Sequence, residues 1–102
     1  IVSQEIFGPV ASLIRFETDE EAIALANSTP FGLAAYLFSL NIQRAWKAAE
    51  RLEAGMVGVN EGIFSNEVVP FGGVKESGLG REGAAEGLDE YLETKFICLG
   101  GM

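Results

Sequence analysis

The sequence predicts an α/β fold built from parallel βαβαβ units and followed by a C-terminal strand. The first observation is that three short apolar runs, at residues 10–16, 34–39 and 56–60, alternate with two helix-like patterns. Parallel strands need crossover connections of this kind, and such crossovers are right-handed. The second observation is size, because 102 residues with 48% hydrophobic content fit one small domain.

The first strand and helix are predicted within residues 10–30. The run at 10–16 is typical of a buried strand. Thr18 begins a capping box, in which its hydroxyl accepts a backbone N–H and Glu21 reaches back to the start of the helix. We expect this helix to end at Asn27 and Ser28, just before Pro30.

A second strand, a second helix and a third strand are predicted in residues 34–60 from the same kinds of pattern. Residues 34–39 predict a strand, and Asn41 is placed to cap the next helix. We expect Gly55 to end that helix and residues 56–60 to form the third strand. One face of this helix is apolar at helical spacing, through Ile42, Ala45, Trp46, Ala49 and Leu52.

The last part of the chain predicts weaker elements. Residues 84–88 are expected to form a short helix, and residues 92–99 alternate in the manner of a final strand. We divide the chain into a main part, 1–90, and a C-terminal strand region, 91–102. Three short strands leave open sheet edges, which would need further chain or another subunit to cover them.

Composition narrows the class of protein. Fifteen acidic and seven basic residues give a net charge of −8, which disfavours nucleic acid and anionic membranes as partners. No signal-peptide pattern and no apolar run of about 20 residues is present, so we predict the cytoplasm, with the mitochondrial matrix as the alternative. A single cysteine fits a reducing compartment. Because the chain begins at Ile1 without an initiator methionine, we expect a piece or a processed product.

Residue types also limit the chemistry. Histidine is absent, which removes histidine-based triads and the commonest metal ligand, so we predict no metal site. Cys98 falls in the predicted terminal strand with no base beside it in the sequence, and we interpret it as a packed thiol. No catalytic residue is therefore assigned to this chain.

The most informative segment is residues 70–82, Pro-Phe-Gly-Gly-Val-Lys-Glu-Ser-Gly-Leu-Gly-Arg-Glu. Its glycines allow close backbone approach, Phe71 supplies an apolar anchor, and clustered polar groups suit a loop that lines a site. A plain glycine-rich surface turn is the alternative. Residues 78–83 also match G-x-G-x-x-G, but the loop before them is not the strand that a dinucleotide fingerprint requires.

Three blocks together carry a family resemblance: Glu-Ile-Phe-Gly-Pro-Val at 5–10, Gly-Val-Asn at 58–60, and the segment 70–82. In this order and at these separations they resemble the C-terminal part of an aldehyde dehydrogenase. The resemblance covers essentially the whole chain, but only the last part of such an enzyme. Further blocks resemble the succinate-semialdehyde dehydrogenase branch of that family, at residues 60–62, 65, 77–83 and 90–95.

The resemblance implies site residues. Glu5 would accept hydrogen bonds from the nicotinamide ribose hydroxyls, and Phe7 would pack near the nicotinamide ring. Ser65 would help to hold the distal carboxylate of the substrate, alongside arginines from elsewhere in the enzyme. Phe71 is expected to form a wall of the substrate site, as are Asn60 and Pro70.

The resemblance also implies a reaction and partners. A cysteine thiolate attacks the aldehyde, a hydride passes to NAD or NADP, and the thioester is hydrolysed. The cysteine and the general-base glutamate lie upstream of this region, as does most of the cofactor site, so this chain alone is expected to be inactive. The implied partners are a small aldehyde, the remainder of the enzyme chain, and further copies in a homodimer or homotetramer joined partly through the strand in 91–102. The alternative is a non-catalytic binding or assembly module derived from the dehydrogenase C-terminus.

Overall fold

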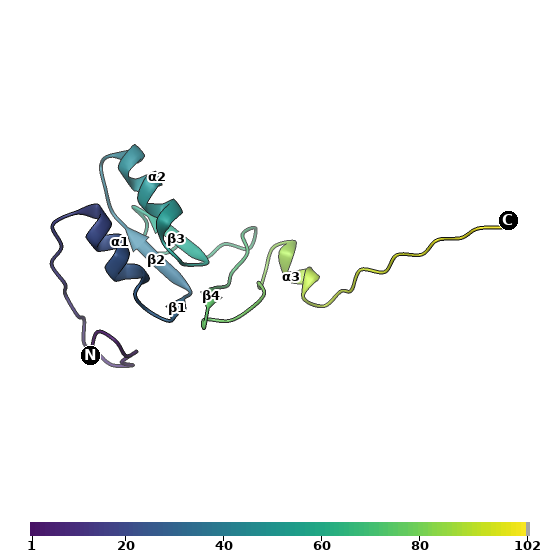
Figure 1. Ribbon diagram of the computed structural model, residues 1–102, viewed down its shortest axis with the longest axis horizontal. Helices are drawn as coiled ribbons and strands as arrows, with labels where there is room; N and C mark the ends of the chain where they lie inside the picture. The colour runs from purple at the N-terminus through teal and green to yellow at the C-terminus, as the bar shows by residue number, and fades with distance from the viewer. Residues whose placement is uncertain (102) are drawn as a thin grey trace.

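The computed structural model describes residues 1–101. Its helices and strands lie between residues 19 and 89, and the segments at the two ends have none (Figure 1). The helices and strands follow in the order α1 (Asp19–Asn27), β1 (Phe31–Gly32), β2 (Ala34–Leu37), α2 (Ile42–Arg51), β3 (Met56–Val59), β4 (Val74–Lys75) and α3 (Glu86–Asp89).

A parallel β2–α2–β3 unit is the centre of the fold. The two strands pair in register from Ala34 opposite Met56 to Leu37 opposite Val59. Backbone hydrogen bonds continue beyond the ladder at its far end, where the N–H of Asn60 donates to the carbonyl of Leu37 at 2.8 Å. This part of the α/β prediction is confirmed.

Helix α1 forms as its cap predicts. The Thr18 hydroxyl accepts the N–H of Glu21 at 3.2 Å, which satisfies one of the free donors of the first turn. The Glu21 carboxylate reaches back to the N–H of Glu17 at 2.8 Å, one residue earlier than a capping box specifies. The helix ends at Asn27, where we expected it to end.

Helix α2 is capped by Asn41, whose side chain accepts the N–H of Arg44 at 3.0 Å. Its residue Ala45 is 1% exposed and, with Ile23 of α1 at 8%, is one of two buried apolar residues among those described. Trp46, on the predicted apolar face, is nevertheless 64% exposed. The face is therefore only partly covered within one copy of residues 1–101.

The predicted first strand, residues 10–16, is wrong in this structure. The segment has no regular secondary structure, and Leu13 on it is 95% exposed. A strand exists only where a neighbour completes its backbone hydrogen bonds, and no strand within residues 1–101 pairs with this segment. The βαβαβ arrangement is thus reduced to one parallel βαβ unit, and β1 pairs instead with β4 in a separate antiparallel ladder.

The C-terminal segment extends away from the rest of the molecule (Figure 1). Residues 92–99 form no strand within this copy, so their predicted use in oligomerisation stays a prediction, as does the division into 1–90 and 91–102. Met102, the last residue of that region, lies outside the described residues. The radius of gyration is 18.5 Å, whereas a compact chain of this length has one of about 13 Å.

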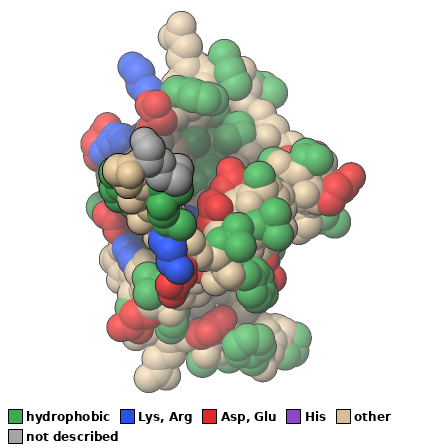
Figure 2. Space-filling model, turned by 90° about the vertical axis from the view of Figure 1, so that its right-hand side faces the viewer, with side chains coloured by type: hydrophobic (Ala, Val, Ile, Leu, Met, Phe, Trp, Pro, Cys, Tyr) green, Lys and Arg blue, Asp and Glu red, His purple; other side chains and the backbone are tan. Residues whose placement is uncertain are grey.

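Apolar side chains are exposed over much of the face seen from the C-terminal end, with acidic side chains between them (Figure 2). Phe7, Leu40, Leu79 and Phe96 are each at least 88% exposed. Single exposed apolar residues are ordinary, but exposure of this extent is typical of surfaces that other chain covers. No helix within residues 1–101 is both long and apolar enough to cross a membrane.

Candidate functional site

The site begins where β3 ends. Asn60 has a φ of 55°, in the left-handed region that asparagine tolerates better than most residues. Its side-chain amide donates to the carbonyl of Ser39 at 2.9 Å, and its oxygen accepts the N–H of Ser39 at 2.8 Å. Asn60 therefore fixes the turn after β3, and its place as a wall of the site stays a prediction.

Ser65 and Phe71, the two predicted substrate residues, lie on one cavity of about 730 Å³ beside β3. Ser65 is exposed, and no hydrogen bond in the described part of the chain engages its hydroxyl. The structure thus brings together two residues that are six positions apart in a loop without regular structure. The lining also includes Gly55, Met56, Val57, Phe64, Asn66, Glu67, Val69, Pro70, Glu82 and Gly83.

The charge of this cavity is one-sided. Glu67 and Glu82 line it, whereas no lysine or arginine of the described residues does. A serine hydroxyl can donate to a ligand carboxylate, but two acidic neighbours would oppose the negative charge. A carboxylated ligand would therefore need cationic groups from outside residues 1–101.

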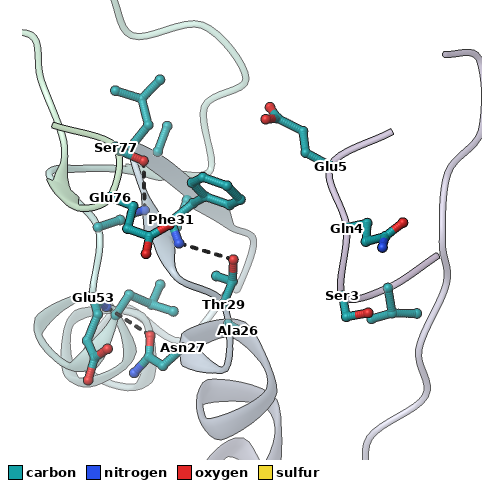
Figure 3. Close-up of a pocket in the computed structure, with 17 residues that line it drawn as sticks. Ser3, Gln4, Glu5, Ala26, Asn27, Thr29, Phe31, Glu53, Glu76 and Ser77 are labelled. Carbon is teal, nitrogen blue, oxygen red and sulfur yellow. Dashed lines mark hydrogen bonds between the residues drawn. The ribbon is translucent and has the colours of Figure 1, made fainter. Parts of the chain in front are cut away.

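Glu5 lies on a different cavity, of about 560 Å³. Figure 3 shows the N-terminal segment with Ser3, Gln4 and Glu5 on one side and Phe31 and Ser77 on the other. The Ser77 hydroxyl accepts the N–H of Gly32 at 2.9 Å, which ties the glycine-rich segment to β1. The Glu5 carboxylate is exposed and is open to hydroxyl donors.

Phe7 is not part of either lining and is 95% exposed. The Glu5 cavity and the cavity of Ser65 and Phe71 share no lining residue. The structure therefore brings the substrate pair together but does not join it to the predicted cofactor pair. The cofactor pair itself is divided, because Glu5 lines a cavity and Phe7 lies outside it.

The glycine-rich segment is fastened internally. Phe71 and Glu82 exchange both backbone hydrogen bonds, at 2.8 and 2.7 Å, and so close the segment into a ring. Arg81 donates from Nη1 to the carbonyls of Gly73 and Gly80, each at 2.8 Å. The Arg81 guanidinium thus holds the backbone of the segment, and within residues 1–101 it forms no ion pair.

Lys75 is held just as firmly. It has a φ of 56°, its Nζ donates to the carbonyls of Asn27 and Thr29 at 2.9 and 3.2 Å, and it forms an ion pair with Glu53. These contacts tie β4 to the ends of α1 and α2. The polar groups of this segment mostly organise the loop, and Phe71 is the aromatic ring that it contributes to the cavity of Ser65.

Sequence reasoning missed Phe64, Asn66 and Glu67, which line the cavity with Ser65. Their position next to Ser65 in the chain was the available signal. It was not enough, because a loop without periodicity does not reveal which side chains face inward.

The clearest electrostatic pair lies away from both cavities. Arg44 makes a bidentate contact with Asp19, and hydrogen bonding from the guanidinium holds the pKa of Asp19 below its ordinary value. The pair joins the N-terminal ends of α1 and α2, so its role is structural. Within residues 1–101, no group of three or more potential ligands is placed to hold a metal ion. Cys98, predicted to be packed, is exposed on the extended C-terminal segment.

Comparisons with known proteins agree with the resemblance in the motifs. The mitochondrial succinate-semialdehyde dehydrogenase of Arabidopsis thaliana is 65% identical over 99 residues, covering 97% of this chain and 19% of that protein. A crystal structure of succinate-semialdehyde dehydrogenase from Burkholderia pseudomallei matches with 61% identity and a TM-score of 0.84, over 88% of this chain and 19% of that one. A crystal structure of an E. coli NADP-dependent enzyme matches with 52% identity and a TM-score of 0.93, over 97% and 21%.

The chain therefore spans about a fifth of the length of the relatives that it matches. The family model that fits it is described as the aldehyde dehydrogenase family, and the match covers residues 1–97. The predicted resemblance is confirmed at the level of the family, with succinate-semialdehyde dehydrogenases among its similar relatives. The chain belongs to the aldehyde dehydrogenase family.

Proposed function

We propose that this chain is the C-terminal portion of an NAD(P)-dependent aldehyde dehydrogenase that oxidises succinate semialdehyde, or a similar ω-carboxy aldehyde, to the acid. The observation that carries the proposal is the cavity shared by Ser65 and Phe71, in which a free hydroxyl faces the same space as an aromatic ring. The identity of 65% to a succinate-semialdehyde dehydrogenase supports this choice of aldehyde.

In the proposed enzyme, Ser65 recognises the distal carboxylate. A hydroxyl donating to a charged group makes a stronger hydrogen bond than one donating to a neutral group. Glu67 and Glu82 on the same cavity make additional cations necessary, and we propose that arginines in the rest of the enzyme supply them. Phe71 forms an apolar wall for the carbon chain of the aldehyde.

Glu5 and Phe7 serve the cofactor in this proposal. The exposed Glu5 carboxylate can accept hydrogen bonds from two neighbouring ribose hydroxyls, and the exposed Phe7 ring offers a flat surface for a planar heterocycle. These residue types fit a nicotinamide nucleoside. When bound, NAD or NADP accepts the hydride that leaves the substrate. The rest of the enzyme would hold most of the cofactor.

The chain on its own is proposed to be inactive. Its one cysteine, Cys98, is on the extended C-terminal segment and lines neither candidate cavity. The nucleophilic cysteine and the general-base glutamate would come from upstream. The alternative, a binding or assembly module without catalysis, is decided by the reading frame before Ile1: a continuous frame with a nucleophilic cysteine supports the enzyme, and a start codon there supports the module.

We further propose a homodimer or homotetramer, joined partly through residues 91–102. The exposed apolar side chains of that segment support this assignment. The cytoplasm is the proposed compartment, with the mitochondrial matrix as the alternative, which the name of the A. thaliana relative favours.

The test uses the intact dehydrogenase with two single substitutions. Ser65→Ala should lose roughly 10- to 100-fold in kcat/KM for succinate semialdehyde, because one donor to a charged group is removed. Butanal, which has the same number of carbons and no carboxylate, should be oxidised as before. Glu5→Gln should slow hydride transfer more than it raises the KM for the aldehyde. Equal losses of Ser65→Ala on both aldehydes would show that the hydroxyl has only a structural role.

A further inference from the structure

The residue before Ser65 is held by an aromatic contact with the central sheet. The ring of Phe64 packs against the ring of Tyr36 on β2, with centroids 5.1 Å apart and planes inclined by 41°. Tilted ring pairs at this separation are favourable beyond the area that they bury. Phe64 is half-buried, although the loop around it is mostly exposed. The contact therefore fixes one point of the loop against the central sheet.

Gly58, in the middle of β3, makes the contact possible. A Cβ at this position would lie 2.8 Å from Cδ1 of Phe64, 2.8 Å from Cδ1 of Tyr36 and 3.0 Å from the carbonyl oxygen of Glu61. Any side chain here would push the two rings and the loop away from the sheet. The absence of a side chain at Gly58 thus lets both rings close over β3.

Local bonds restrain the loop on both sides of Ser65. Before it, the Glu61 carboxylate accepts the N–H of Gly62 at 3.0 Å, so the turn after β3 has a fixed course. After it, the Asn66 side chain accepts the N–H of Val68 at 3.0 Å. Between these turns, the Phe64 ring contacts Tyr36 on β2, and Ser65 follows Phe64 directly in the chain.

We infer that the Tyr36–Phe64 ring pair positions the Ser65 hydroxyl and thereby sets the preference for carboxylated aldehydes. The inference rests on the proposed role of Ser65. Tyr36 and Phe64 are positioning residues here. Phe64 lines the cavity with Ser65, but Tyr36 does not, so Tyr36 acts only through Phe64.

The experiment measures selectivity in the intact dehydrogenase, as the ratio of kcat/KM for succinate semialdehyde to kcat/KM for butanal. This ratio is independent of how much of each preparation is folded. Tyr36→Leu and Phe64→Leu remove one ring each. Each should lower the ratio about 5- to 50-fold, mainly through a higher KM for succinate semialdehyde, because a misplaced hydroxyl loses part of its bond to the charged group.

Two controls sharpen the result. Tyr36→Phe keeps the ring, and the Tyr36 hydroxyl makes no hydrogen bond in residues 1–101. This variant should therefore have the same selectivity ratio as the parent. Combining Tyr36→Leu with Ser65→Ala should lower the ratio no further than Ser65→Ala does alone, because both changes act on one hydroxyl. Additive losses would overturn the inference.

The remaining outcomes distinguish the positioning role of the ring pair from the proposed contact of Ser65 with the substrate. If Ser65→Ala lowers the ratio and Tyr36→Leu leaves it unchanged, the positioning role is wrong and the proposed function stands. If Ser65→Ala leaves the ratio unchanged, the proposed substrate contact fails first, and the inference fails with it.

Discussion

Residues 17–60 and the segments at the two ends of the chain, 1–16 and 91–101, have similar proportions of apolar residues but differ in what these side chains pack against. The central region has two capped helices and a parallel strand pair, and it contains Ile23 and Ala45, the two buried apolar side chains of residues 1–101. The end segments have apolar side chains such as Leu13 and Phe96, at 95% and 88% exposure, and no regular element.

The difference separates local signals from signals that need a partner. A helix cap satisfies backbone donors within four residues, so the starts of α1 and α2 are specified by neighbouring residues of the chain. A strand satisfies its backbone groups only through a neighbour. The end segments have strand-like patterns without a neighbour, and we interpret them as surfaces that the proposed enzyme completes.

The largest expected effect is on the oligomeric state, and it follows from removing the C-terminal end segment. Deleting residues 91–102 from the intact dehydrogenase should shift it towards monomer, because an exposed segment of alternating apolar residues is suited to strand addition on a second copy. Light scattering measures the change in mass. A truncated enzyme that keeps its oligomer mass would place this segment inside its own subunit instead.

The second prediction tests how tightly the central region holds the glycine-rich segment. A Cβ on Gly55 would lie 2.1 Å from the carbonyl oxygen of Gly72 and 2.7 Å from Cα of Gly73, both backbone atoms. Gly55→Ala should therefore lower the thermal midpoint of the intact enzyme, at a cost of about 1–3 kcal/mol for forced backbone shifts. Gly62→Ala is the matched control, since nothing lies within 4 Å of its Cβ. Similar midpoints for both variants would contradict the close packing.

The third prediction tests whether the Thr18 cap defines the start of α1. Thr18→Ala removes the hydroxyl that accepts the N–H of Glu21 and should cost about 1 kcal/mol of stability. Thr18→Ser keeps a hydroxyl at the cap and should recover most of the loss. Chemical denaturation of the intact enzyme, followed by circular dichroism, measures both. An unaffected Thr18→Ala variant would mean that tertiary packing, and not the cap, defines the start of α1.

The smallest effect concerns pH. Hydrogen bonding to Arg44 holds the pKa of Asp19 below its ordinary value, so the folded state favours the ionised carboxylate. The contribution to stability is present above the ordinary pKa of the carboxyl group and is lost as the pH falls through the lowered folded value. Asp19→Asn should thus be less stable than the parent near pH 6, and the difference should shrink towards pH 3. Glu20→Gln, which loses a 3.5 Å ion pair to Arg51, is the control for general surface charge. A difference that does not change with pH would assign the effect to packing.

The central elements could be predicted because their signals are short-range. The caps at Thr18 and Asn41 and the stop at Asn27 are each specified by a few neighbouring residues, and the structure has all three. The β1–β4 ladder could not be predicted, because it joins residues more than forty positions apart and each strand has two residues. No periodicity can be seen in two residues.

In the candidate site, too, short-range motifs could be predicted and long-range contacts could not. The substrate pair Ser65 and Phe71 was predicted from motifs and lies on one cavity. The ring contact between Tyr36 and Phe64 could not be predicted, because it depends on how a loop returns to a strand twenty-eight positions earlier in the chain. The roles of Glu5 and Phe7 stay predictions, since the rest of the cofactor site would come from other parts of the enzyme.

The ring closed by Phe71 and Glu82 has a consequence for how this region can change over evolutionary time. Both backbone hydrogen bonds of the pair depend on the number of residues between them, so an insertion or deletion within 72–81 would break both at once. Residues 61–69 have no such closure and can vary in length or composition without opening the ring. New aldehyde preferences would therefore arise by drift in 61–69, while 70–82 keeps its length.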